Sequence, residues 1–235
     1  MRFAAVADIH LRTDDHEENV RRFSSVNDVA DLLVIAGDFT NHGLPEEMRE
    51  CISVLEHVRI PIVAVLGNHD YESGNQDELA GMLRVAGVHL LDGHCFEFDE
   101  VGFAGTKGFC GGFTPYELMP FGEGGIKSFV EIAHREAIKL DYGLAQLRTS
   151  VKIAITHYSP IKETVVGEPE PIFPFLGSSR LERVLEHHRP SLALHGHAHH
   201  GTFSGSTRSG IKVRNVSLPI LRERGEQHPF TIFCF

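Results

Sequence analysis

The segment PIVAVLGNHD, residues 61–70, joins a short apolar run to a cluster of polar and turn-forming residues. A run of this length, rich in Val and bounded by turn residues, predicts a strand that is buried on both faces. Ligands bind at the carboxyl ends of strands in open α/β sheets, so the cluster stands where a site is expected. If five such strands lie side by side in one sheet, their clusters converge on one edge. The other four runs are FAAVA before Asp8-Ile9-His10, DLLVIA before Gly37-Asp38, VKIAIT before His157, and SLALH before Gly196-His197-Ala198-His199.

Length and composition fit one globular domain over residues 1–235. Hydrophobic residues make up 42% of the 235, enough for a large core, and no repeat or change of composition marks a linker. The formal net charge of −10 argues against a general nucleic-acid-binding surface, because Lys and Arg supply most of that affinity. Nucleic acid is therefore not an expected partner.

The first residues and the cysteines bear on location. Met1-Arg2-Phe3 runs directly into the first predicted strand without the apolar region of a signal peptide, and no apolar run is long enough to span a bilayer. We therefore expect a cytoplasmic protein that makes no membrane contact. The four cysteines lack redox or zinc-ribbon spacing and are expected to be reduced thiols: Cys51, Cys95, Cys110 and Cys234.

Segments with helical periodicity separate the strands. Pro45 suits a first helical position, and Gly87 suits the end of a helix. We expect helices at 20–29, at 45–55, at 79–86, at 126–147 with an interruption near 141–143, and after Ser178 or Ser179 as far as Pro190.

The pattern changes after residue 87. The segment 106–125 is rich in Gly, Phe and Pro and has no periodicity, and a loop of that length in a compact domain is more often functional than incidental. Short apolar runs surround it. We expect an antiparallel meander of strands at 88–91, 95–98 and 101–105, a hairpin of 201–203 with 211–216, and a closing strand at 230–233.

Together the five clusters resemble the calcineurin-like metallophosphoesterases. The elements D-x-H, G-D, G-N-H-D, a strand-ending His and G-H-x-H occur in that superfamily's order between Asp8 and His199, most of the chain. A single D-x-H or G-D is a weak signal, whereas the ordered set is a strong one. The resemblance implies an α/β fold, a four-layer α-β-β-α sandwich of two mixed sheets flanked by helices, with a dinuclear metal site at strand carboxyl ends.

The resemblance also implies the metal ligands. Asp and neutral His suit borderline divalent metals, and the absence of Cys from the clusters disfavours a structural zinc site. Taken singly, each residue is read first as a turn or strand cap. Two divalent ions are expected, and Mn, Fe, Zn, Ni and Co all accept such ligands. Asp38 would bridge the ions, with Asp8, His10 and His199 completing one site and Asn68, His157 and His197 the other.

His69 and Asp70 are the expected catalytic residues. In the family a His at this position stabilises developing charge or protonates the leaving oxygen, and we expect Asp70 to orient the His69 ring and keep it protonated. One departure concerns Asn41, where many relatives have an acidic residue. This change is expected to alter how substrate or a neighbouring group is held, not the metal ligands.

Eleven of the sixteen histidines lie outside the clusters and are expected to have ordinary surface or core roles. His195 and His200 flank the last cluster and are the exceptions that we single out, as groups that support a ligand or contact substrate.

The Gly-rich segment 105–113 has two interpretations. It lacks the G-K-[ST] ending of a Walker A sequence, so a surface turn is preferred over a phosphate grip. Our hypothesis is a specificity loop in which Phe109 and Phe113 pack on the substrate. Replacing both with Ala would then change selectivity among phosphoesters and spare metal binding.

These features predict a hydrolase of phosphoester bonds, most specifically a phosphodiesterase that cleaves a small or nucleotide-like phosphodiester by attack of a metal-bound hydroxide. A phosphomonoesterase would share the same ligands. A nuclease would be favoured by an extra DNA-binding domain and basic grooves, which this acidic chain lacks. A noncatalytic binding scaffold of the same fold is the alternative from another class, and the intact ligand set with His69 and Asp70 argues against it.

Overall fold

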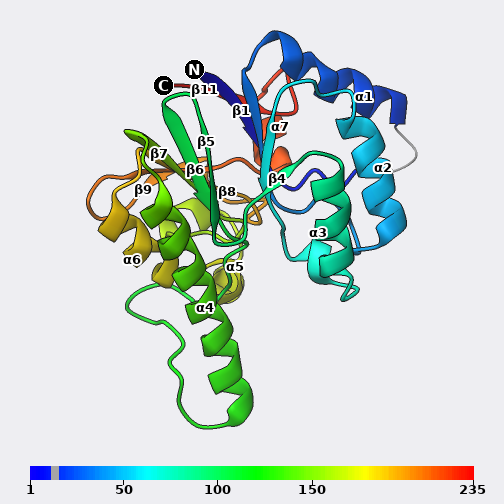
Figure 1. Ribbon diagram of the computed structural model, residues 1–235. Helices are drawn as coiled ribbons and strands as arrows, with labels where there is room; N and C mark the ends of the chain where they lie inside the picture. The colour runs from blue at the N-terminus through cyan, green and yellow to red at the C-terminus, as the bar shows by residue number, and fades with distance from the viewer. Residues whose placement is uncertain (12–15) are drawn as a thin grey trace.

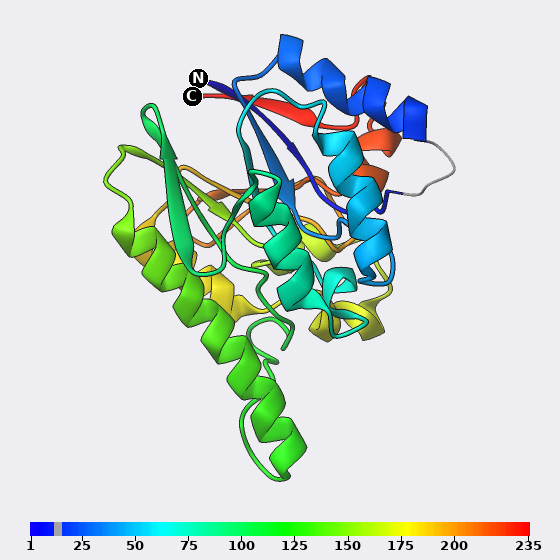
Figure 2. The same ribbon diagram turned by 45° about the vertical axis from the view of Figure 1, so that its right-hand side comes forward.

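Two mixed β-sheets pack face to face, and helices cover both outer sides (Figure 1). The computed structural model describes residues 1–11 and 16–235. Seen from a second direction, the helices near the N-terminus remain on one side of the paired sheets, and α4 (Gly124–Gln146) remains on the other (Figure 2). The predicted four-layer sandwich of two mixed sheets is confirmed.

The first sheet has the strand order β11-β1-β2-β3-β4. Its members are β1 (Arg2–Val6), β2 (Leu32–Ala36), β3 (Ile62–Val65), β4 (His89–Leu90) and β11 (Thr231–Cys234). The strands β1 to β4 run parallel, and β11 pairs antiparallel with β1, which places the two termini side by side (Figure 1). Three of the five predicted clusters therefore follow adjacent parallel strands, β1, β2 and β3.

The second sheet has the order β5-β6-β7-β8-β10-β9. Its members are β5 (His94–Phe98), β6 (Val101–Gly105), β7 (Val151–Ile155), β8 (Leu192–His195), β9 (Ser204–Ser206) and β10 (Lys212–Asn215). The outermost strands β5 and β9 are antiparallel to their neighbours, and the four inner strands are parallel. The remaining two clusters follow β7 and β8.

Alternation along each central strand divides its side chains between two cores. In β1, Phe3 and Ala5 pack between the sheets, whereas Ala4 and Val6 pack under the helices of the outer layer. Because both faces are buried, such strands are apolar at every position, and that explains the continuous runs in the sequence. Full burial of a side chain such as Phe3 contributes about 1.5–3 kcal/mol.

The helices lie close to where the periodicity predicts them. Ser178 caps α6 by accepting a hydrogen bond from the amide of Arg180, and Pro45 begins α2. The outer layer of the first sheet contains α1 (His16–Ser24), α2 (Pro45–Leu55), α3 (Gln76–Val85) and α7 (Leu218–Glu223), and the second sheet carries α4 and α6 (Ser179–His188), with the short α5 (Phe173–Leu176) beside them. Short 3-10 helices occur at Ser25–Asp28, His69–Tyr71, Lys162–Val165 and Glu170–Ile172.

Several local predictions were wrong. The five cluster strands do not share one sheet, since three lie in the first sheet and two in the second. The predicted meander at 88–105 is divided in the same way: β4 pairs parallel with β3, and only β5 and β6 form an antiparallel hairpin. The first strand of the predicted 201–216 hairpin begins at Ser204, because the amide of Thr202 bonds to the carbonyl of Thr164 instead.

The predicted interruption of the long helix is also absent, as α4 runs unbroken from Gly124 to Gln146. Gly143 serves packing: a Cβ there would lie 3.0 Å from the carbonyl oxygen of His94. Among the described residues, no helix is both long and apolar enough to cross a bilayer.

Candidate metal centre

The loops that follow β1, β2 and β8 turn sharply at predicted ligands. Asp8, His10, Asp38 and His197 have φ angles of 57°, 39°, 55° and 67°. Left-handed backbone at a residue with a side chain costs about 1–3 kcal/mol, and such strain gathers at functional sites. Two glycines permit the close approach. A Cβ on Gly37 would lie 2.5 Å from Nδ1 of His157, and one on Gly67 would overlap the Asp38 carboxylate.

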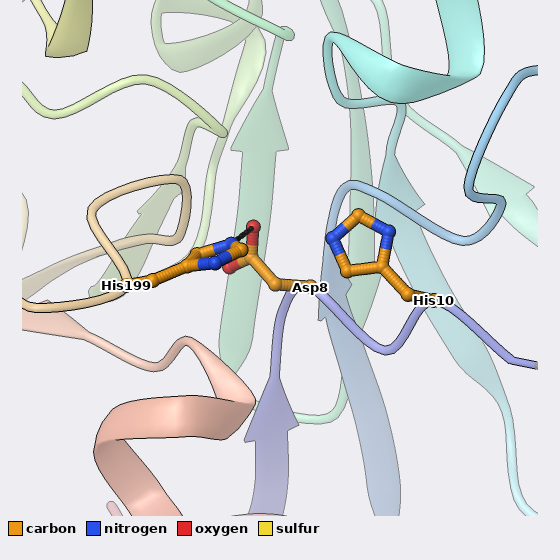
Figure 3. Close-up of side chains that lie close together, drawn as sticks. All are labelled: Asp8, His10 and His199. Atoms are coloured by element: carbon orange, nitrogen blue, oxygen red, sulfur yellow. Dashed lines mark hydrogen bonds and ion pairs between the residues drawn. The ribbon is translucent and has the colours of Figure 1, made fainter.

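The first group consists of Asp8, His10 and His199. Each offers a ligand atom within 4.8 Å of the others. Nε2 of His199 lies 3.0 Å from Oδ1 of Asp8, and Figure 3 shows the two imidazoles on either side of the Asp8 carboxylate. The same carboxylate also accepts hydrogen bonds from the amide of His197, at 3.1 and 3.0 Å. These three residues meet the geometric requirement for one metal ion.

The second group consists of Asp38, His157 and His197, with Asn68 beside them. Nε2 of His157 lies 2.8 Å from Oδ1 of Asn68 and 3.3 Å from Oδ2 of Asp38. The four side chains come from the ends of β2, β3, β7 and β8, so both sheets contribute. The structure thus brings together all seven residues predicted as metal ligands.

Asp38 lies between the two groups. Its Oδ2 is 3.7 Å from Nε2 of His10 in the first group and 3.3 Å from Nε2 of His157 in the second. That oxygen is buried and has no hydrogen-bond partner among the described residues. An unsatisfied buried carboxylate oxygen is costly, and a cation would satisfy it. The donor set therefore fits two divalent ions that share Asp38.

Backbone carbonyls fix the orientation of four histidine rings. A carbonyl only accepts, so the ring nitrogen facing it carries the proton and the opposite nitrogen presents a lone pair. For His197 the tethered nitrogen is Nε2, which leaves Nδ1 to face the second group. The tethers join His10 Nδ1 to Thr40 O at 2.9 Å, His69 Nδ1 to Asn41 O at 2.7 Å, His157 Nδ1 to Ala36 O at 2.9 Å, and His197 Nε2 to Phe175 O at 3.2 Å.

The charges in the centre are strongly coupled. Burial alone would lower the pKa of His157, but the negative charge of Asp38 raises it to about 9. Burial alone would raise the pKa of Asp38, but His157 holds it well below its usual range. Burial and the neighbouring His157 lower the pKa of His197 to about 4. A metal ion would replace the proton on His157, because imidazole binds metals in its neutral form.

Asp70 does not contact the His69 ring in the described structure, so the predicted orienting contact was wrong. Its buried carboxylate accepts instead from the amides of Thr40 at 3.0 Å, Gly67 at 2.9 Å and Phe39 at 3.4 Å. Burial, with the charge of Asp38, raises the pKa of Asp70 to about 6. Asp70 therefore ties together the loops that follow β2 and β3.

His69 stands at the edge of the first group. Its ring centroid is 4.7 Å from that of His10, and its side chain is 35% exposed. The Glu72 carboxylate lies 3.6 Å from Nδ1. His10, Asp38 and His69 also satisfy the distance requirement for a metal group, so geometry alone does not separate a catalytic His69 from a ligand.

The two histidines that flank the last cluster differ in what they contact. His195 is fully buried, with its ring between the carbonyl of Gly196 and the hydroxyl of Thr164, both at 2.8 Å. Burial lowers its pKa to about 4. It supports the loop before His197. His200 contributes its amide, which bonds to Glu168.

The Gly-rich segment 105–113 is a structured turn. The amides of Gly108, Gly111 and Gly112 donate to Glu136, Pro174 and Gly177, so they are not directed at a phosphate. Phe113 is buried in a cluster with Val165, Phe173, Leu176 and Ala198, and the expectation that it packs on the substrate was wrong. Phe109 is half-buried between Phe129 and Tyr158.

Two features of the centre escaped the sequence analysis. The tethering carbonyls of Ala36, Thr40, Asn41 and Phe175 belong to the main chain, which leaves no signal in residue type. A hollow of about 440 Å³ adjoins the first group, and its lining includes Asn19 and Arg222. A single arginine far along the chain also gave no signal.

Comparisons with known proteins agree with this geometry. A family model described as calcineurin-like phosphoesterase matches residues 1–201. Glycerophosphodiester phosphodiesterase GpdQ of Enterobacter lignolyticus is 29% identical over 82 residues, 30% of this chain and 30% of that protein. DNA double-strand break repair protein Mre11 of Archaeoglobus fulgidus is 32% identical over 109 residues, 37% of this chain and 25% of that protein. The chain thus spans less than a third of the length of either curated relative.

A solved structure extends the fold comparison to the whole chain. Phosphopantetheinyl hydrolase PptH from Mycobacterium tuberculosis superposes with a TM-score of 0.72 at 15% identity, covering 98% of this chain and 95% of that one. Identity this low is evidence for the fold alone. The family match over most of the chain decides the classification: the chain belongs to the calcineurin-like phosphoesterase family, whose members hydrolyse phosphoester bonds.

Proposed function

We propose that the protein is a metal-dependent phosphodiesterase that acts on a small or nucleotide-like phosphodiester. The observation that carries the proposal is the intact donor set, seven candidate ligand side chains that include a shared and buried Asp38. Two divalent ions held there would lower the pKa of a bound water and neutralise charge on the phosphate oxygens. The relative GpdQ, named as a phosphodiesterase, favours a diester.

The chain's own residues supply positioning and a proton. Because Nδ1 of His69 donates to the Asn41 carbonyl, a protonated ring carries its second proton on Nε2. We assign His69 to stabilise the leaving oxygen and to donate this proton to it. Asp70 acts as a positioning residue, since it holds the backbone of Thr40 and Gly67 next to the ligands.

The hollow beside Asp8, His10 and His199 is the proposed entrance for substrate. Arg222 lines it and presents a guanidinium, whose fork of N–H donors matches phosphate oxygens. A phosphodiester carries one negative charge between two substituents, so a cation at the rim and an open volume of about 440 Å³ suit a small organic diester.

The test combines metal analysis with turnover. We expect about two metal ions per chain and hydrolysis of bis-para-nitrophenyl phosphate faster than of para-nitrophenyl phosphate. His69→Ala should retain metal and lose about 10²-fold or more in rate, in line with loss of a proton donor. Asn68→Ala should lose metal from the second group.

His94→Ala, an exposed histidine on β5, is the matched control and should behave as the wild type. Faster turnover of the monoester would replace the diester proposal with a phosphomonoesterase, and selective cleavage of DNA would point to a nuclease. Metal-loaded protein that is inert on every phosphoester would favour a binding scaffold.

A further inference from the structure

Lys107 is a buried lysine enclosed by aromatic rings. Its side chain is only 8% exposed, and Nζ lies 5.0 Å, 4.9 Å and 5.1 Å from the ring centroids of Tyr71, Phe109 and Tyr158. Aromatic faces attract a cation but do not replace the hydrogen bonds that an ammonium makes in water. The proposed phosphodiesterase chemistry gives this residue no role.

The ammonium is incompletely satisfied. Nζ donates to the carbonyl of Gly108 at 2.9 Å, which uses one of its three N–H groups. No carboxylate within the described ranges forms an ion pair with it; the nearby Asp92 and Glu136 pair with Lys139 instead, each at 2.8 Å. Buried lysines usually have a charged partner, and the remaining N–H groups of Lys107 are free to bind an anionic ligand.

Lys107 also faces a pocket. A hollow of about 320 Å³ lies between the α3 layer and the end of β6, and Lys107 lines it together with Tyr71 and Leu91. Of the charged residues around this pocket, Asp77 and Arg84 offset each other at the exposed rim, and Asp92 is paired with Lys139. Asp92 and Glu136 together carry two negative charges against the one positive charge of Lys139, so they attract Lys107 through space, but neither forms an ion pair with its ammonium.

Lys107 is connected to the metal centre through single residues. Tyr158 contacts both, with its ring centroid 4.5 Å from the His197 ring and 5.1 Å from the Lys107 ammonium. The carbonyl of Lys107 accepts the amide of His157 at 2.9 Å, and Tyr71 follows His69 by two positions. The organic part of a substrate that occupies both places would have to span the Tyr158 ring.

We propose that Lys107 and the pocket lined by Tyr71 form a subsite for a second phosphate of the substrate. The inference rests on the proposed function and narrows it to diesters that carry an additional phosphate. A phosphate would accept hydrogen bonds from the two unused N–H groups of the ammonium and place a negative charge in direct contact with it. Tyr71 and the apolar wall formed by Leu91 would contact the organic part between the two phosphates.

The experiment measures, by calorimetry, the affinities of two ligands for two proteins. Thymidine 3′,5′-bisphosphate and thymidine 5′-monophosphate are bound to the metal-loaded wild type and to Lys107→Met. We expect the bisphosphate to bind the wild type about tenfold or more tightly than the monophosphate, as for one charged hydrogen-bonded pair. In Lys107→Met that preference should vanish, while affinity for the monophosphate stays within about twofold.

Lys127→Met, the same change at an exposed lysine of α4, is the control and should keep the preference. Lys107→Gln retains a donor for the Gly108 carbonyl and removes the charge, so it should also lose the preference, and it serves in place of the Met variant if that protein does not fold. An equal loss of both affinities, or no loss of either, would show that Lys107 is structural and overturn the subsite.

Kinetics separate this inference from the proposed function. The para-nitrophenyl ester of thymidine 5′-phosphate, with and without a 3′-phosphate, should show a KM difference of about tenfold in the wild type and none in Lys107→Met. A wild type that binds the bisphosphate preferentially but hydrolyses neither ester would refute the phosphodiesterase and leave the subsite standing.

Discussion

Two glycine-bearing loops beside the metal centre use similar residues in opposite ways. In the loop at 67–70, the amides of Gly67 and His69 bond to the carboxylates of Asp70 and Asp38, both at 2.9 Å. The side chains of Asn68 and His69 in that loop lie at the candidate metal centre. In the loop at 105–113, the amides of three glycines donate to Glu136, Pro174 and Gly177, away from the candidate ligands. Phe113 of this loop packs into a core cluster.

The difference separates two kinds of functional signal. When the side chains of a loop are themselves the candidate ligands, their residue types are visible in the sequence. The order D-x-H, G-D, G-N-H-D can therefore be recognised. A loop that acts through its main chain, or through one side chain facing a pocket, has a composition that many surface turns share. Substitutions can test whether the loop at 67–70 takes part in catalysis and whether the loop at 105–113 mainly stabilises the fold.

The largest effect is expected at Asp38. Asp38→Asn keeps the size of the side chain but removes the negative charge next to both His10 and His157. Metal content should fall at both sites, and kcat/KM for bis-para-nitrophenyl phosphate should drop by at least about 10³-fold, since several kcal/mol of charge stabilisation are lost. Asp99→Asn, in the exposed turn between β5 and β6, is the control. Full metal content in Asp38→Asn would refute the shared ligand.

Phe113→Ala tests the second loop. Phe113 is 7% exposed and packs with Val165 and Leu176, so its truncation should lower the free energy of unfolding by about 3–5 kcal/mol, measured in urea. Selectivity between phosphoesters should change by less than about twofold in the protein that remains folded, because the ring does not face substrate. Phe121→Ala, at a position 69% exposed, should change stability by no more than about 0.5 kcal/mol. Altered selectivity without loss of stability would restore the specificity-loop hypothesis.

The layered fold and the gathered ligands were predictable because each depends on side chains repeated in a pattern. Continuous apolar runs such as 62–65 gave the strands, and the clusters after them gave the candidate ligands. The split of the five strands between two sheets was not predictable from these runs. A strand buried on both faces looks the same in either sheet, and only the pairing partner differs.

The contacts that hold the candidate ligands in place could not be predicted as well from the sequence. Asp70 follows His69 directly, yet its carboxylate turns to the amides of Thr40 and Gly67, a choice set by the spacing of two loops. The histidine tethers end on carbonyls, which every residue has. The sequence placed Lys107 in a Gly-rich surface turn, because its aromatic neighbours Tyr71 and Tyr158 are distant in sequence.

The pH dependence of metal affinity, which depends on the proton of His157, is expected to be an effect of intermediate size. Asp38 raises the pKa of His157 from 6.5 to about 9, so metal must displace a proton from the ring at neutral pH. Affinity at the second group should rise about tenfold per pH unit between pH 7 and about 8. Calorimetry in buffers of different ionisation enthalpy should record release of about one proton per ion at this group. Affinity that does not vary with pH would contradict the coupling.

The sign for stability follows from the same shift. A folded-state pKa above the ordinary value means that the His157–Asp38 pair stabilises the metal-free protein fully below about pH 6.5 and that this contribution is lost as pH rises through about 9. Chelated protein should therefore unfold at lower urea concentration at pH 9 than at pH 6.5, and added metal should reduce the difference.

The smallest effect is expected at Asn41, where family members often have an acidic residue. The structure gives the Asn41 side chain no part in holding the His69 ring: the main-chain carbonyl accepts from Nδ1 of His69 at 2.7 Å, and the amide donates to Glu47 at 3.2 Å. Asn41→Asp keeps both main-chain groups and should change kcat/KM by less than about threefold, because the contact to the His69 ring comes from the main-chain carbonyl. The Glu47 carboxylate accepts hydrogen bonds from the amides of Asn41 and His42. Glu47→Gln removes its charge and weakens both bonds, so it should lower kcat/KM more than Asn41→Asp does. The reverse order would mean that residue type at 41, and not the path of its backbone, positions His69.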